Sequence, residues 1–125
     1  MATSDEAVVV TLERLRASPL KKPELSQLVE ELCISRPALE TRFKGVVGRS
    51  IRDESVRLRV VAIRKLITQT DLPLKTIAAR AGFRSVQYMT TYLHRHTGTT
   101  PARLRIVERR LTESSPPPRE ADLPG

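Results

Sequence analysis

One short stretch decides the fold: residues 77–85 read IAARAGFRS. The small residue Ala78 lies inside an apolar helical pattern that begins near Leu74, Gly82 breaks that pattern, and Ser85 can cap the helix that follows. A helix, a tight turn and a second helix are what a helix-turn-helix unit requires. The stretch therefore predicts one such unit in the second half of the chain, with Gly82 in its turn.

The first half of the chain repeats the same pattern. The first four matched positions are 49 residues apart and the last three are 50 apart, so one residue is inserted in the turn between the two helices. The matched pairs are Leu28 with Ile77, Val29 with Ala78, Cys33 with Gly82, Ile34 with Phe83, Leu39 with Met89, Phe43 with Leu93, and Gly48 with Gly98. Each copy is expected to form a helix-turn-helix unit. The alternative is a helical bundle in which similar helices recur by chance.

Apolar residues recur every three or four positions, and no sustained alternation of period two occurs. The pattern predicts an all-α fold of seven helices, with two helix-turn-helix subdomains joined by a long connector helix. The expected helices cover residues 5–17, 23–33, 35–48, 50–68, 74–82, 85–98 and 102–111. The expected divisions are a flexible N-terminus (1–7), a first subdomain (8–49), the connector (50–69), a second subdomain (70–111) and a disordered tail (112–125).

The sequence also predicts where one helix begins and which side chains face the core. Pro23 is expected at the first position of the second helix, where a proline costs no hydrogen bond. Val46 is expected to point inward with Leu39 and Phe43. The connector is expected to bury one stripe, formed by Ile51, Leu58, Ala62 and Leu66.

The charge of the chain points to a polyanion as its partner. Lys and Arg number 22 against 14 Asp and Glu, a net charge of +8 on 125 residues. Residues 20–110 hold 19 of the basic and 8 of the acidic side chains, and residues 72–107 hold no carboxylate. The cations of this segment, which has no carboxylate to pair with them, are Lys75, Arg80, Arg84, Arg95, Arg103 and Arg105. Nucleic acid is the first candidate, and an aromatic content of 3% weakens a single-strand or RNA interpretation.

The sequence lacks the residues that a metal site, an enzyme active site, a secreted protein or a membrane protein would need. The single cysteine, Cys33, forms no internal disulfide or zinc site and is expected to be a buried small apolar residue. His94 and His96 diverge by about 200° on a helix and cannot share a metal. No nucleophile-base-acid set, cofactor loop, secretory signal or run of about 18 apolar residues occurs. We expect a cytoplasmic protein that is not an enzyme and that uses no metal or cofactor.

Residues 77–85, together with GTTPARLR at 98–105, resemble the signature of AraC/XylS-type bacterial transcription regulators. SRPALETRFK at 35–44, with Gly48, is similar to the family's first reading helix and is most like its xylose-operon branch. The resemblance covers Val8 to Arg105. It implies sequence-specific binding to double-stranded DNA, with the second helix of each unit in the major groove on one face of the duplex.

The resemblance also implies which residues contact DNA. The implied base-reading residues are Arg36, Pro37, Glu40, Thr41, Val86, Gln87 and Thr91. The candidates for phosphate contacts are Arg42, Lys44, Arg84, His94, Arg95 and His96. For Glu40 the plainer alternative is an ion pair with Lys44, four residues further on. The family usually has small residues at Val29 and Cys33, so this turn carries a side chain where Gly would accept a left-handed conformation more easily.

Partners beyond DNA are less defined. The connector arginines Arg52, Arg57, Arg59 and Arg64 are most simply a solvated face, and RNA polymerase is a possible partner for them. We expect this chain to be a monomer, with a dimerisation or effector domain belonging to a longer parent protein if there is one. A non-specific basic protein that binds RNA or coats the nucleoid is the alternative function.

Overall fold

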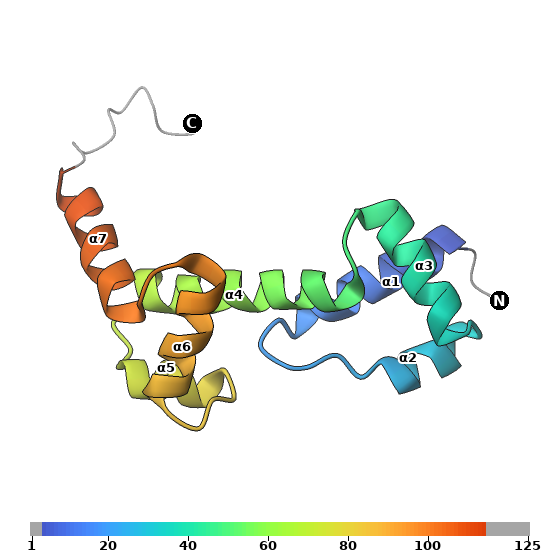
Figure 1. The fold of residues 1–125 in the computed structure, drawn as a ribbon, viewed down its shortest axis with the longest axis horizontal. Coiled ribbons are helices and arrows are strands. Elements are labelled where there is room, and N and C mark those ends of the chain that lie inside the picture. Colours follow the sequence, from blue (N-terminus) through green and yellow to red (C-terminus); the bar gives the residue numbers. More distant parts are fainter. Residues whose placement is uncertain (1–3, 115–125) are drawn as a thin grey trace, which may run out of the picture.

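The computed structural model describes residues 4–114, with side chains for residues 6–111. Within the described residues the chain forms seven helices and no strand, as predicted (Figure 1). They are α1 (Ser4–Ala17), α2 (Leu25–Leu32), α3 (Arg36–Val47), α4 (Ile51–Gln69), α5 (Leu74–Arg80), α6 (Val86–Thr97) and α7 (Pro101–Ser114). Two of the segments predicted from the sequence overlap with helices. Residues 4–7, predicted as part of a flexible N-terminus, are helical, and Ala7 is buried. Residues 112–114, predicted as part of a disordered tail, belong to α7. Residues 1–3 and 115–125 lie outside the described residues.

The long helix α4 joins two separate groups of helices, with α1, α2 and α3 at one end and α5, α6 and α7 at the other (Figure 1). Each group has its own hydrophobic core. The first core is centred on Leu28, Leu39 and Phe43, and the second on Ile77, Met89 and Leu93. The two-subdomain fold predicted from the sequence is therefore confirmed.

The connector α4 does not bury the single stripe that was predicted. Its buried residues are Ile51 and Glu54 near its start and Ile63 and Ile67 near its end. Ile51 and Ile63 are 12 residues apart, which places them about 120° apart around the helix. Because each end of α4 serves a different core, its buried face changes along its length. Leu58, Ala62 and Leu66, predicted on one buried stripe, are only half-buried.

Two other local expectations are wrong. Val46 is 61% exposed, because at this end of α3 its neighbour Val47, about 100° further around the helix, is the residue that packs against the first core. Pro23 lies outside α2, whose N-cap is Glu24 and whose first helical residue is Leu25. The residues between α1 and α2 cross to the other subdomain, where Leu20 packs against the second core.

Arg105 of α7 holds the end of α4 in place. From the sequence it was expected to have no carboxylate partner nearby. In the structure its guanidinium donates to the carbonyl oxygens of Ile67 at 3.0 Å, Leu72 at 2.8 Å and Thr70 at 3.4 Å. The last carbonyls of a helix have no partner within the helix, so a cation placed there satisfies them. Arg105 therefore joins α7 to α4 and to the chain that follows it.

Candidate nucleic-acid interface

The two helix-turn-helix units have the same turn geometry. In the first, Cys33 N donates to Glu30 O at 3.2 Å and Ile34 N to Val29 O at 3.3 Å. In the second, Gly82 N donates to Ala79 O at 3.1 Å and Phe83 N donates to Ala78 O at 2.9 Å. Each of these residues lies 49 positions after its counterpart in the first unit. Both turns pass through the left-handed region, with φ of 53° at Cys33 and 83° at Gly82. Cys33 is exposed, so its prediction as a buried residue is wrong.

A serine begins the second helix of each unit. The Ser35 hydroxyl accepts from Ala38 N and the Ser85 hydroxyl accepts from Tyr88 N, both at 3.3 Å. Each helix ends at a glycine with positive φ, Gly48 or Gly98. These caps define the length of α3 and α6 and which of their side chains face outward.

The outward face of α6 is made of exposed polar side chains. Met89 and Leu93 anchor the helix in the second core. The opposite side carries Gln87, Thr91 and Arg95, whose spacing of four residues places them along one face. His94 and Arg84 are also exposed. Val86 is half-buried and packs against the second core, so little of its side chain is available.

Sequence reasoning missed one residue of this face. Tyr88 is 59% exposed and lies between Arg84 and Thr91 at helical spacing. A helical projection of α6 would have found it, since it lies on the side away from Met89 and Leu93. His96, in contrast, turns back toward α4, because its ring packs on Tyr92 with the ring centroids 4.5 Å apart.

On α3 the residues implied to read bases, together with the phosphate candidate Lys44, divide into two groups. Pro37, Thr41 and Lys44 lie on the side opposite the buried Leu39 and Phe43. The remaining pair, Arg36 and Glu40, form an exposed ion pair, with Arg36 Nε 3.4 Å from Glu40 Oε1. Glu40 thus pairs with Arg36, and not with Lys44 as considered from the sequence. Arg42 is exposed at the other edge of α3.

Two threonines leave mainly their methyl groups for an apolar contact. The Thr41 hydroxyl donates to Pro37 O at 2.9 Å, and the Thr91 hydroxyl donates to Gln87 O at 3.0 Å. Their hydroxyl protons are therefore already in use within the helix.

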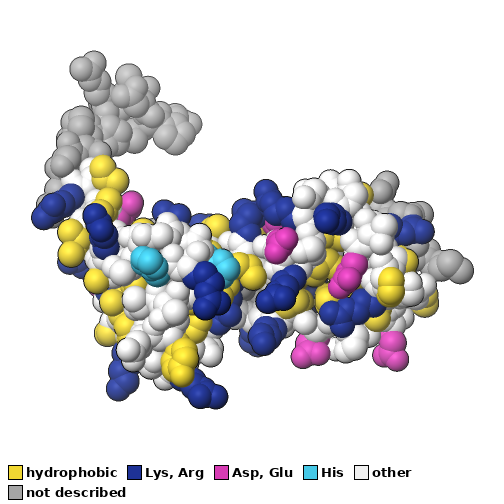
Figure 2. Space-filling model, in the orientation of Figure 1, with side chains coloured by type: hydrophobic (Ala, Val, Ile, Leu, Met, Phe, Trp, Pro, Cys, Tyr) yellow, Lys and Arg dark blue, Asp and Glu magenta, His cyan; other side chains and the backbone are white. Residues whose placement is uncertain are grey.

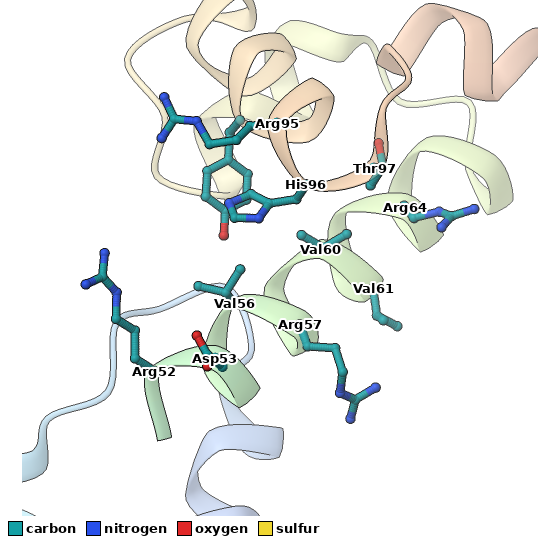
Figure 3. Close-up of a pocket in the computed structure, with 11 residues that line it drawn as sticks. Arg52, Asp53, Val56, Arg57, Val60, Val61, Arg64, Arg95, His96 and Thr97 are labelled. Carbon is teal, nitrogen blue, oxygen red and sulfur yellow. The ribbon is translucent and has the colours of Figure 1, made fainter. Parts of the chain in front are cut away.

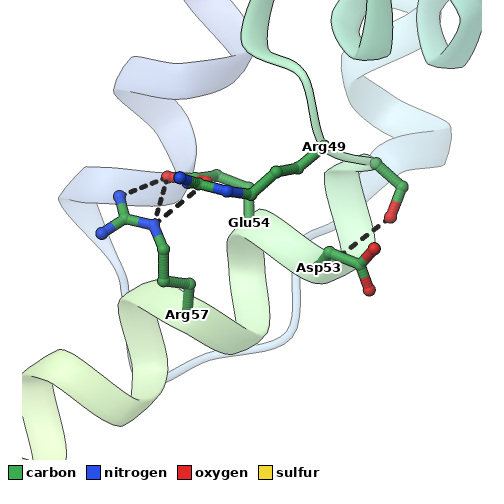
Figure 4. A network of polar contacts seen from close by, with 5 residues as sticks. Arg49, Asp53, Glu54 and Arg57 are labelled. Carbon is green, nitrogen blue, oxygen red and sulfur yellow. Dashed lines mark hydrogen bonds and ion pairs between the residues drawn. The ribbon is translucent and has the colours of Figure 1, made fainter.

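Two arginines of α4, expected as part of a solvated face, are instead structural. The Arg59 guanidinium stacks over the Phe83 ring at 4.4 Å and the Tyr92 ring at 4.9 Å, and it donates to Ala81 O at 2.7 Å. Cation–π contacts of this kind join α4 to the turn of the second unit. Arg57, with Arg49, pairs with buried Glu54, whose side chain is 2% exposed (Figure 4).

These ion pairs shift the pKa of Glu54. The hydrogen bond from Arg57 is the largest cause that lowers the pKa of this carboxyl, with help from Arg49, and burial opposes them. The same contact raises the pKa of Arg57. The carboxylate is the stable form, and it fixes the start of α4 against the loop after α3.

Basic side chains gather on the face that Figure 2 shows, including the part between the two subdomains. A cleft of about 1000 Å³ lies there between α4 and the end of α6, lined by Arg52, Arg57, Arg64 and Arg95 (Figure 3). A second cleft of about 420 Å³ lies between α4, the start of α3 and Tyr92. No group of three or more His, Cys, Asp or Glu among the described residues is placed to hold a metal ion. No helix within residues 4–114 is both long and apolar enough to cross a membrane.

Comparisons with known proteins agree with this geometry. The xylose operon regulatory protein of Escherichia coli strain K12 is 30% identical over 104 residues, which are 83% of this chain and 26% of that protein. The chain thus spans about a quarter of the length of this curated relative. The structure of the xylose-binding transcription activator xylR is similar with a TM-score of 0.71 and 29% identity, over 86% of this chain and 28% of that chain.

The DNA-binding domain of AdpA, solved in complex with a target DNA, has the same fold. Its TM-score is 0.72 at 20% identity, over 86% of this chain and 97% of that chain. The family described as "Helix-turn-helix domain" matches residues 28–106, which include both turns and both capped helices described above. The chain therefore belongs to the family of AraC-type helix-turn-helix transcription regulators.

Proposed function

We propose that the chain binds a specific double-stranded DNA sequence as a bacterial transcription regulator, with α3 and α6 in two major grooves on one face of the duplex. The repeated turn geometry carries this proposal, because it presents two capped helices with exposed polar faces from two equivalent units. The basic surface between them supplies attraction to the phosphate backbone.

The exposed side chains suggest which bases are read. Gln87 has the donor and the acceptor that adenine requires, Arg36 can contact guanine, and Glu40 can accept from cytosine. The methyl group of Thr91 suits thymine, and Thr41 offers the same apolar group on α3. Pro37 offers shape only. Val86 has the weakest support, because it is half-buried.

Phosphate contacts are proposed for the cations that flank these faces. Lys44, Arg84 and Arg95 are exposed and form no ion pair within the described residues. Arg42 and His94 are exposed as well. His96 has weaker support, because its ring packs on Tyr92.

Site selection from a random duplex pool, followed by footprinting, tests the proposal. We expect protection of one defined sequence and an affinity that falls by orders of magnitude between low and moderate salt, since several phosphates are neutralised. Uniform coating of any duplex, or preference for RNA, would instead favour a nucleoid-type or RNA-binding protein.

We further propose that the chain binds its site as a monomer in the cytoplasm. A titration followed by analytical ultracentrifugation should give one chain per selected duplex.

Contact with RNA polymerase through the exposed Arg57 and Arg64 of α4 is a separate proposal. It predicts that Arg64→Ala reduces recruitment of polymerase without changing the affinity for DNA.

A further inference from the structure

The two clefts beside α4 form one continuous basic surface between the subdomains, because Arg52, Val56 and Tyr92 line both of them. We call this surface the central cleft. Its cations come from four parts of the chain: Lys21 and Lys22 before α2, Arg36 of α3, Arg52, Arg57 and Arg64 of α4, and Arg95 of α6.

Three cations of the central cleft, Lys21, Lys22 and Arg52, have side chains that form no ion pair or hydrogen bond within the described residues. Of the other cations, Arg36 pairs with Glu40 and Arg57 with Glu54, and Asp53 also lines the larger cleft. Like charges that line one cleft repel one another, and a bound anion relieves this repulsion.

The central cleft also has unused hydrogen-bonding groups. The Tyr92 hydroxyl and Arg59 Nε are buried and have no hydrogen-bond partner within the part of the chain that the structure describes. A buried polar atom without a hydrogen-bond partner destabilises the fold. Both residues line the smaller cleft of about 420 Å³, which has ample room for a phosphate group.

The position of the cleft identifies the anion. It lies between the start of α3, which contributes Arg36, and α6, which contributes Tyr92 and Arg95. If both helices enter successive major grooves, the backbone strands that border the intervening minor groove pass between them. These strands carry the phosphates nearest to the cleft.

We propose that the central cleft binds backbone phosphates of the DNA between the two major-groove contacts, through Lys21, Lys22 and Arg52. These residues were assigned no DNA contact from the sequence. The inference rests on the proposed function, and it adds a third contact region in the middle of the binding site. That region orients both subdomains on one duplex and does not depend on the base sequence.

The test compares Arg52→Ala and the double variant Lys21→Ala/Lys22→Ala with Lys65→Ala. Lys65 is an exposed cation of the same helix as Arg52, and its position 13 residues later places it about 140° around the helix. All four side chains are exposed, so circular dichroism should show the same fold for each variant. Titrations over salt on the selected duplex measure the number of phosphates neutralised.

We expect Arg52→Ala to flatten the salt slope by about one unit and the double variant by about one to two units. Lys65→Ala should leave the slope unchanged. Ethylation of single phosphates in the DNA should interfere with wild-type binding at the centre of the footprint, and Arg52→Ala should lose that interference. Slopes equal to the wild type for both variants, with intact specific binding, would overturn the inference and leave the proposed function standing. Failure of the wild type to select a sequence would instead contradict the proposed function.

A free phosphate has the same chemistry as a backbone phosphate. Inorganic phosphate is therefore titrated into the DNA-free chain at constant ionic strength, with chemical shifts of the cleft residues as the readout. We expect no saturable binding in the millimolar range, because the cations are spread to meet a strand and not a single ion. Saturation at low phosphate concentration that Arg52→Ala abolishes would assign the cleft to a free anion and overturn the proposal.

Discussion

At the scale of single residues, Gln87 and Arg95 are expected to do different work on the same face of α6. They are eight residues apart, which is about 12 Å along the helix. Gln87→Ala should cost about 1–3 kcal/mol on the preferred site and relax the preference at one base pair, because only a base edge uses both its donor and its acceptor. Arg95→Ala should weaken all sequences alike and flatten the salt slope by about one unit.

Titrations of both variants on the selected duplex and on a scrambled one measure this difference. An equal loss of affinity by the Gln87 variant on both duplexes would mean that Gln87 contacts backbone or holds the fold, and α6 would then not lie in the groove as proposed.

The turn residues Cys33 and Gly82 give a second prediction at this scale. Both have positive φ, which costs an L-residue with a side chain about 1–2 kcal/mol. Gly82→Ala should therefore destabilise the second unit by about that amount, even though the space around its Cα is open. Cys33→Gly should be neutral or stabilise the first unit by up to about 1 kcal/mol, since relief of strain is partly offset by greater freedom of the unfolded chain.

Urea denaturation measures both changes. Gly45→Ala is the matched control, because Gly45 lies within α3 with helical geometry and open space, and its replacement should stabilise by about 0.5–1 kcal/mol. A stable Gly82→Ala variant would show that the second turn does not require its left-handed conformation.

At the scale of helices, the ends were easier to predict from the sequence than the buried faces. Ser35, Ser50 and Ser85 cap helices as short local patterns predict, since each hydroxyl accepts from a backbone N–H three residues further on. The role of Arg59 could not be predicted, because its partners Phe83, Tyr92 and Ala81 are at least 22 residues away in the sequence. The change of buried face along α4 has the same cause: it depends on which core each end meets.

The start of α4 provides a pH prediction. The pKa of Glu54 is lowered from its ordinary value of 4.5 in the folded state, so the unfolded state holds the proton more tightly. This stabilisation is fully present above the unfolded pKa and is lost as pH falls through the folded pKa. Glu54→Gln should lower the free energy of unfolding at neutral pH by about 1–3 kcal/mol, since it removes charged hydrogen bonds to Arg49 and Arg57.

Thermal or urea unfolding between pH 7 and pH 3 follows the difference between wild type and variant. The difference should shrink below about pH 4.5, first because the carboxyl of the unfolded chain takes up a proton and then, at lower pH, because the folded carboxyl does so. Glu30→Gln is the control, because Glu30 is exposed and forms no ion pair with any described residue, and its effect should be small throughout. A difference that stays constant across this range would mean that the Glu54 ion pairs do not stabilise the fold.

At the scale of the whole molecule, the internal repeat predicted two equivalent units, but not how they are held together. The sequence offers no signal for the contact of Leu20 with the second core or for the central cleft, because both depend on packing across α4. These contacts, with Arg59, attach each subdomain to one continuous helix. The distance between α3 and α6 is therefore expected to be fixed.

A rigid connector predicts a strict spacing between the two halves of the DNA site. The 19 residues of α4 span about 28 Å, which suits two major grooves about 34 Å apart on one face of a duplex. Inserting five base pairs between the half-sites turns one of them to the opposite face. Inserting ten base pairs returns that half-site to the same face but moves it one further helical turn away.

If the subdomains cannot separate, both insertions should reduce affinity about a hundredfold or more, to that of a single reading helix. Anisotropy titrations on the three duplexes measure this loss. Recovery of affinity with ten base pairs would show that α4 yields and that the subdomains bind as independent units, because only a flexible link can follow the half-site along the helix axis.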